Sequence, residues 1–137
     1  MRVVTWNCQG GFRNKANDIL NLKPDILCVQ EMECPDRIDF SKHIAKPNSH
    51  VWYGGGKVKG LGALSYNSAS VSKIESHNKL FRHGLPVECV IDNVKMDIFN
   101  VWTKRKGKSA PHDLTYIDYV IEALPFYSDL NYDNLCS

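Results

Sequence analysis

Residues 1–32 read MRVVTWNCQGGFRNKANDILNLKPDILCVQEM and decide the fold, because their pattern is that of a strand, a loop, a helix and a second strand. The first strand, Arg2–Trp6, is rich in β-branched and aromatic residues and ends at Asn7, before the turn-forming pair Gly10-Gly11. The second strand, within Asp25–Met32, has an apolar core suited to burial on both faces. The connecting segment has a helical apolar face that ends at a proline (Ile19, Leu20, Leu22; Pro24).

Both strands end in polar side chains. Strands joined by a helical crossover lie parallel, so Asn7 and Glu31 should emerge at the same edge of the sheet. Open α/β sheets bind their ligands at that edge. We therefore expect an amide and a carboxylate to converge there, whereas Gln30 should point to the opposite side of a regular strand and be structural.

Three motifs together resemble a known family. They are Trp6-Asn7 closing the first strand with PDILCVQE at 24–31, the glycine-led strand GLGALSY at 60–66, and the run 96–103 followed by a long helix. This pattern resembles the amino-terminal half of the endonuclease/exonuclease/phosphatase family, which includes exonuclease III and deoxyribonuclease I. The resemblance covers nearly the whole chain.

The resemblance implies an α/β (α+β) fold class and one domain over residues 1–137. It implies half of a four-layer α/β sandwich, with a mixed, mostly antiparallel sheet and helices on one face. The family packs two sheets face to face, and we expect the partner sheet to be absent. A bare apolar sheet face is unusual in a monomer, so we expect a second copy in a homodimer, or the missing carboxy-terminal half, to cover it.

The resemblance also implies a hydrolase of phosphodiesters or phosphomonoesters that depends on Mg²⁺ or Mn²⁺. Asn7 and Glu31 map onto catalytic positions, and Glu31 onto a metal ligand, a role that suits a cation accepting one or two carboxylates. The ordinary alternatives are a solvated acid and a turn-forming amide. The family's later motifs, a Gly-Asp-Phe-Asn-like turn and an Asp-His pair, have no match before Ser137, so we expect this chain alone to be inactive or nearly so.

Residues 100–105 hold the predicted substrate contacts. Asn100 and Trp102 stand where many relatives have Asn-x-His, and an indole cannot carry a proton as that histidine does. Asn100, Lys104 and Arg105 are the predicted substrate-binding residues, the two basic ones by attracting a phosphate backbone. Lys57 and Lys59, in a glycine-rich turn, are candidates of the same kind, although most such charges belong to solvated loops.

The remaining segments are predicted to form hairpins, an edge strand and two helices within one compact unit. We expect hairpins over 50–66 and over 87–102, the second turning at Asp92-Asn93, which tolerates positive φ angles. We also expect a loop with a short helix over 33–48, an edge strand over 71–77 and a helix over 114–127.

Composition sets the remaining bounds. The 137 residues are 43% hydrophobic, enough for a core, and the net charge of +2 is too weak to argue nucleic-acid binding by itself. No apolar run approaches the roughly 18 residues of a membrane span, and no leader precedes the first strand, so we expect a cytoplasmic protein without membrane contact. Five cysteines without a Cys-x-x-Cys pair are expected to be reduced thiols.

Three functions remain open from the sequence. The first is the phosphoester hydrolase, with DNA or RNA among its substrates. The second is a non-catalytic module that binds nucleic acid or phosphate through the basic edge, and the third is a folded remnant without a ligand.

Overall fold

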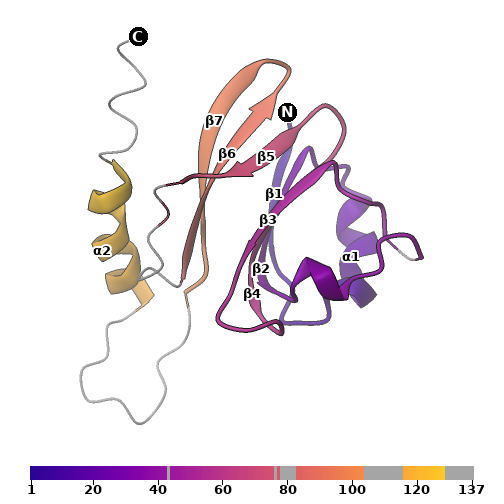
Figure 1. Cartoon of the computed structure of the whole chain (residues 1–137), viewed down its shortest axis with the longest axis horizontal. Helices are drawn as coiled ribbons and strands as arrows, with labels where there is room; N and C mark the ends of the chain where they lie inside the picture. The colour runs from indigo at the N-terminus through magenta and orange to yellow at the C-terminus, as the bar shows by residue number, and fades with distance from the viewer. Residues whose placement is uncertain (43, 76, 78–82, 104–115, 129–137) are drawn as a thin grey trace.

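Two β-sheets pack face to face, and one helix lies outside each of them (Figure 1). The computed structural model describes residues 1–42, 44–75, 77, 83–103 and 116–128. Its elements are β1 (Val3–Asn7), α1 (Phe12–Leu20), β2 (Ile26–Met32), the 3₁₀ turn η1 (Pro35–Arg37), β3 (Ser49–Tyr53), β4 (Gly60–Ser65), β5 (Ser70–Lys73), β6 (Gly84–Ile91), β7 (Val94–Val101) and α2 (Tyr116–Ser128).

The first sheet has the strand order β1-β2-β4-β3, and the second has the order β5-β6-β7. β1 pairs with β2 in parallel, with Asn7 opposite Gln30, and all other pairs are antiparallel. The predicted strand-helix-strand unit is thus confirmed. So is the fold class, an α+β partial sandwich with mixed, mostly antiparallel pairing.

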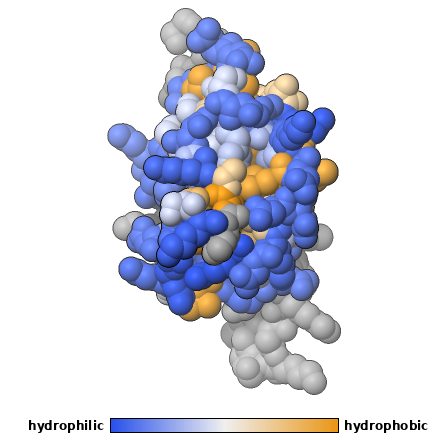
Figure 2. All heavy atoms as spheres, turned by 90° about the vertical axis from the view of Figure 1, so that its right-hand side faces the viewer, coloured by the Kyte–Doolittle hydropathy of each residue, from blue (hydrophilic) through white to orange (hydrophobic). Residues whose placement is uncertain are grey.

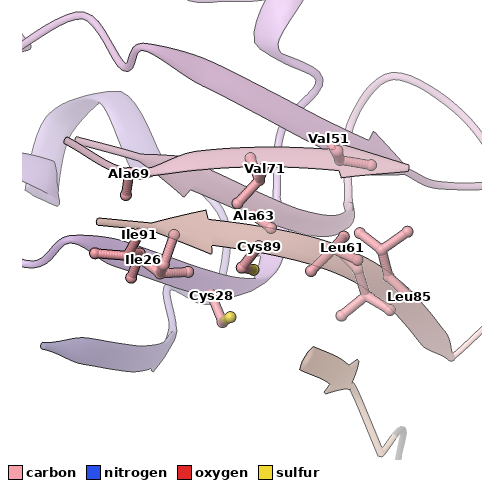
Figure 3. Close-up of a cluster of buried hydrophobic side chains, with 11 residues drawn as sticks. Ile26, Cys28, Val51, Leu61, Ala63, Ala69, Val71, Leu85, Cys89 and Ile91 are labelled. Atoms are coloured by element: carbon pink, nitrogen blue, oxygen red, sulfur yellow. The ribbon is translucent and has the colours of Figure 1, made fainter. Parts of the chain in front are cut away.

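The main core lies between the two sheets (Figure 3). The first sheet supplies side chains from β2, β3 and β4, and the second from β5 and β6, with one from the turn before β5; they are Ile26, Cys28, Val51, Leu61, Ala63, Ala69, Val71, Leu85, Val87, Cys89 and Ile91. Burying one such aliphatic side chain stabilises the fold by about 1.5–3 kcal/mol. The expectation of a missing partner sheet was therefore wrong, because β5, β6 and β7 cover the face that a second copy or the missing carboxy-terminal half was expected to cover. Alternation along a strand shows that one face is buried but not which element buries it.

A second core lies between the first sheet and α1. Phe12 and Ala16 of α1 are buried against Leu27, Val29 and Met32 of β2. The predicted apolar face of this helix is only partly right, since Leu22 lies beyond the helix end and is 49% exposed. Seen from the α1 side, the surface is mostly hydrophilic, with a small hydrophobic area (Figure 2).

The predicted hairpins and the carboxy-terminal helix are confirmed within the described residues. Asp92 and Asn93 both have positive φ angles, 49° and 67°, as the tight turn between β6 and β7 requires. β3 pairs antiparallel with β4, and β5 is an edge strand, shorter than expected. Within 33–48 the described short helix is the single turn η1, and residues 114 and 115 of the predicted helix lie outside the described residues.

Four cysteines are buried and free, which confirms the expected thiols for the described residues; they are Cys8, Cys28, Cys34 and Cys89. Burial raises the pKa of Cys28 to about 12 and that of Cys89 to about 11, so both are inert core groups. Cys136 lies outside the described residues. In the described part of the chain, no helix is long and apolar enough to cross a bilayer.

We expect Gly60→Ala to destabilise the protein by about 1–3 kcal/mol. A Cβ atom at Gly60 would lie 2.4 Å from the backbone oxygen of Tyr53 and 2.6 Å from the Trp52 ring, and a backbone oxygen in a paired strand cannot move aside. Gly56→Ala is the control, because a Cβ there meets nothing within 4 Å. Urea unfolding measures both free energies, and equal midpoints for the two variants would contradict this account.

Candidate functional site

Asn7 and Glu31 meet at the carboxyl edge of β1 and β2. The Asn7 side-chain amide Nδ2 donates a long hydrogen bond to Glu31 Oε1, at 3.4 Å. Asn7 is exposed, whereas the Glu31 side chain is only 17% exposed. The predicted convergence of an amide and a carboxylate is confirmed, and the chemical roles of the two residues stay predictions.

Glu31 forms a β-bulge that sets the direction of its carboxylate. Pairing passes from Gln30 opposite Leu61 to Met32 opposite Gly60, so Glu31 is an extra residue on β2. Its φ of 58° is left-handed, a conformation that costs a residue other than glycine about 1–3 kcal/mol. Bulges of this kind redirect side chains next to functional sites. The sequence predicts a regular strand here, and the bulge is a feature that this prediction lacks.

Lys59 supplies a positive charge to Glu31, a pairing that was not predicted from the sequence. Its ammonium Nζ lies 2.5 Å from Glu31 Oε2, and it directly precedes Gly60, the residue that pairs with Met32. The pairing register of β4 on β2 is the signal that places Lys59 beside Glu31, and the two residues lie 28 positions apart in sequence.

The loop between β1 and α1 is held in place from both sides. The backbone N–H of Gln9 donates to Asn7 Oδ1 at 3.0 Å, which fixes the orientation of the Asn7 amide. Lys15 Nζ donates to the carbonyls of Cys8 and Gly10, at 2.9 and 3.3 Å. The amide group of Asn7 thus faces Glu31 because its oxygen is already bound.

Asn100 lies buried between the sheets, with 3% of its surface exposed. Its Nδ2 donates to the carbonyl of Gly62 at 2.9 Å and, weakly, to that of Val29 at 3.5 Å. Its Oδ1 accepts from Gln30 Nε2 at 2.7 Å, and Gln30 also donates to Thr5 Oγ1 at 3.1 Å. The predicted contact of Asn100 with a substrate would require this hydrogen-bond network to open. Gln30 has a structural place in the network, as expected.

The other residues of the predicted substrate edge lie apart or cannot be placed. Trp102 is half-buried against the core between the sheets; its backbone N–H donates to the carbonyl of His83 at 2.8 Å, and its ring lies edge-on to that histidine. Lys104 and Arg105 lie outside the described residues. Lys57 is exposed in the turn before β4.

Glu33 is a second carboxylate near the site, and no short motif in the sequence indicates its role. It is buried and accepts from the Arg13 backbone N–H at 3.3 Å, from Arg13 Nε at 2.9 Å and from Arg13 Nη2. These bonds to Arg13 hold the pKa of Glu33 below its usual range. Because Arg13 is in the first turn of α1, Glu33 compensates the positive end of that helix.

The donor set fits a magnesium ion only in a minimal form. Among the described residues, no group of three or more His, Cys, Asp or Glu side chains could hold a metal. Glu31 offers one carboxylate, and Asn7 turns its amide nitrogen toward that carboxylate because its oxygen is bound to the Gln9 N–H. Mg²⁺ keeps several waters and commonly binds one or two carboxylates together with substrate phosphates, so a single hard carboxylate ligand suits it.

Comparison with known proteins supports the fold. No family model and no curated protein sequence matches the chain. Among solved structures, the 3′ phosphatase NExo from Neisseria, bound to a product DNA hairpin, is similar with a TM-score of 0.55 and 17% identity. The match covers 98% of this chain and 52% of that one, so the chain spans about half the length of the structure it matches. This likeness shows a shared fold, and the resemblance to the endonuclease/exonuclease/phosphatase family holds at that level.

We expect Asn100→Leu to lower the free energy of unfolding by about 1–3 kcal/mol, since the Gly62 carbonyl and one Gln30 donor lose a buried partner. Asn17→Leu on the exposed side of α1 is the matched control, with an expected change within about 0.5 kcal/mol. Chemical denaturation measures both. Equal losses in the two variants would show that the bond network between the sheets contributes nothing.

We expect Glu33→Gln to weaken the acid sensitivity of the fold. The folded pKa of Glu33 is lowered, so its ion pair stabilises the protein above the unfolded value of about 4.3 and is lost as pH falls below it. The free energy of unfolding of the wild type should therefore drop more steeply below about pH 5 than that of the variant. The exposed Glu75 provides the control, Glu75→Gln. Parallel pH profiles for wild type and Glu33→Gln would contradict the assignment.

Proposed function

We propose that this chain provides part of a phosphate-ester hydrolase site, with nucleic acid among its substrate classes. The observation that carries the proposal is the meeting of Asn7 and Glu31 at one sheet edge, in a fold shared with a DNA-bound 3′ phosphatase. Membership of the endonuclease/exonuclease/phosphatase family and dependence on Mg²⁺ or Mn²⁺ are parts of the same proposal.

In this proposal Glu31 holds the divalent ion and Asn7 orients the carboxylate. The bulge fixes the direction of Glu31, and the Gln9 N–H leaves the Asn7 donors free to face the carboxylate or a phosphate oxygen. When bound, the metal supplies charge neutralisation for the phosphate. Asn100 then acts through Gln30, by holding the strand that carries Glu31.

Hydrolysis also needs a group that activates water and a group that stabilises the leaving oxygen. The described contacts of the Glu31 carboxylate are with Asn7 and Lys59, and neither an amide nor an ammonium group can act as a general base. Groups that act as a unit lose activity by a factor on the order of a thousand or more when one is removed. We infer that this chain alone hydrolyses phosphate esters weakly or not at all, and that residues elsewhere or another chain complete the site.

Metal binding tests the role of Glu31 independently of turnover. We expect Glu31→Gln to weaken Mn²⁺ binding at least about tenfold, because it removes the charge of the carboxylate that would hold the ion. Electron paramagnetic resonance of free Mn²⁺ measures the affinity, and Glu75→Gln should leave it unchanged. Equal affinities of wild type and Glu31→Gln would overturn the proposed metal site.

Hydrolysis of a generic phosphodiester and of a 3′-phosphorylated DNA hairpin with Mg²⁺ then tests completeness. Turnover that Glu31→Gln abolishes would mean that the chain completes its own site. Turnover that survives Glu31→Gln would contradict the assigned site.

The Lys59–Glu31 ion pair favours one second candidate, a phosphate- or nucleic-acid-binding module without catalysis. A carboxylate already neutralised by an ammonium group repels a phosphate less than a bare one. Salt-dependent DNA affinity without hydrolysis and without Mn²⁺ binding would support this candidate.

A further inference from the structure

Both oxygens of the Glu31 carboxylate are already in contact with donors of the protein. Lys59 Nζ lies 2.5 Å from Oε2, and Asn7 Nδ2 lies 3.4 Å from Oε1. We propose that Lys59 is the resident counter-cation of this site, and that a divalent cation and the Lys59 ammonium compete for the Glu31 carboxylate. This inference rests on the proposed metal site.

The position of Lys59 is set by the packing of β4 on β3 and by the β1–α1 loop. Gly60, the next residue, is packed so closely on Tyr53 and Trp52 that a Cβ atom there would overlap both, which anchors the backbone beside Lys59. On the other side, the aliphatic stem of Lys59 passes the β1–α1 loop, where a Cβ atom at Gly10 would lie 3.6 Å from Lys59 Cε. The lysine therefore approaches Glu31 along a defined path.

The two partners of the ion pair differ in their freedom to move. Glu31 is mostly buried and fixed by its bulge, whereas the Lys59 side chain is 47% exposed at the end of a flexible four-carbon stem. A divalent cation that binds Oε2 is repelled by the ammonium group at the same oxygen. Lys59 is the partner that can move away, because the ammonium can return to water without disturbing either core.

The exchange would also relocate a positive charge. While Lys59 is paired with Glu31, its charge is neutralised by the carboxylate. After a divalent cation displaces it, the ammonium group lies unpaired at the same sheet edge. A lysine ammonium is a compact point charge that binds phosphate oxygens. Metal loading and the availability of this positive charge would thus be coupled.

The test compares Mn²⁺ affinity in the full chain for wild type, Lys59→Met and Lys57→Met. Methionine keeps an apolar stem without the charge, and Lys57 is an exposed lysine of the same turn, so it controls for net charge. We expect Lys59→Met to tighten Mn²⁺ binding about fivefold and Lys57→Met to change it less than about twofold. Unchanged or weaker binding in Lys59→Met would overturn the competition.

A second readout follows the lysine itself. Acylation of each lysine by an amine-reactive reagent is measured by peptide mass spectrometry, with and without saturating Mg²⁺. Labelling of Lys59 should rise on Mg²⁺ addition in the wild type while that of Lys57 stays constant, and in Glu31→Gln it should be high from the start. A Lys59 labelling rate that Mg²⁺ leaves unchanged would contradict displacement.

The two proposals fail in different ways. If Glu31→Gln leaves Mn²⁺ affinity unchanged, the metal site itself is wrong. If Glu31→Gln weakens binding but Lys59→Met fails to tighten it, the metal site stands and the competition alone is wrong.

Discussion

The parallel register of β1 on β2 is the constraint on which the candidate site depends. It sets Asn7 opposite Gln30, and the next residue of β2 is the bulged Glu31. The antiparallel register of β4 on the same strand then brings the residue before Gly60 to the carboxylate. Three side chains from three segments are thus placed by backbone pairing, before any contact between the side chains themselves.

The second sheet supports the three side chains of the site by packing on the face of the first sheet that is opposite α1. Its apolar face buries the side chains of β2 and β4 that point away from α1, and one polar residue, Asn100, crosses the interface to bind the backbone of both strands. A buried polar network that is satisfied in this way fixes one relative position of the sheets, whereas an apolar interface tolerates small shifts. The bulge is therefore held on both sides, by α1 packing through Met32 and by the Gln30–Asn100 pair.

Much of the fold followed from local sequence signals, because those signals act over a few residues. The buried run of β2, the Asp92-Asn93 turn and the crossover helix are each specified by residues that are adjacent in the sequence. The convergence of Asn7 and Glu31 followed from the parallel direction of two strands that are joined by one crossover helix. The second sheet could not be predicted in this way, since a strand pattern shows which face is buried and not which element buries it.

The parts of the site that sequence could not provide are contacts between distant segments. The Lys59–Glu31 pair and the burial of Asn100 depend on pairing registers that no short motif specifies. The bulge at Glu31 has no glycine or asparagine to mark it, so a regular strand was the natural expectation. Glu33 was hidden for the same reason, because its partner Arg13 lies 20 positions earlier.

The left-handed backbone at Glu31 has a consequence for directed evolution. Glycine and asparagine adopt this conformation more readily than glutamate, so Glu31→Gly or Glu31→Asn would relieve local strain. A screen that rewards only thermal stability would therefore tend to enrich these substitutions and remove the carboxylate. Under the role proposed for Glu31, stability and function would be selected in opposite directions at this one position, as is common where a strained residue serves a site.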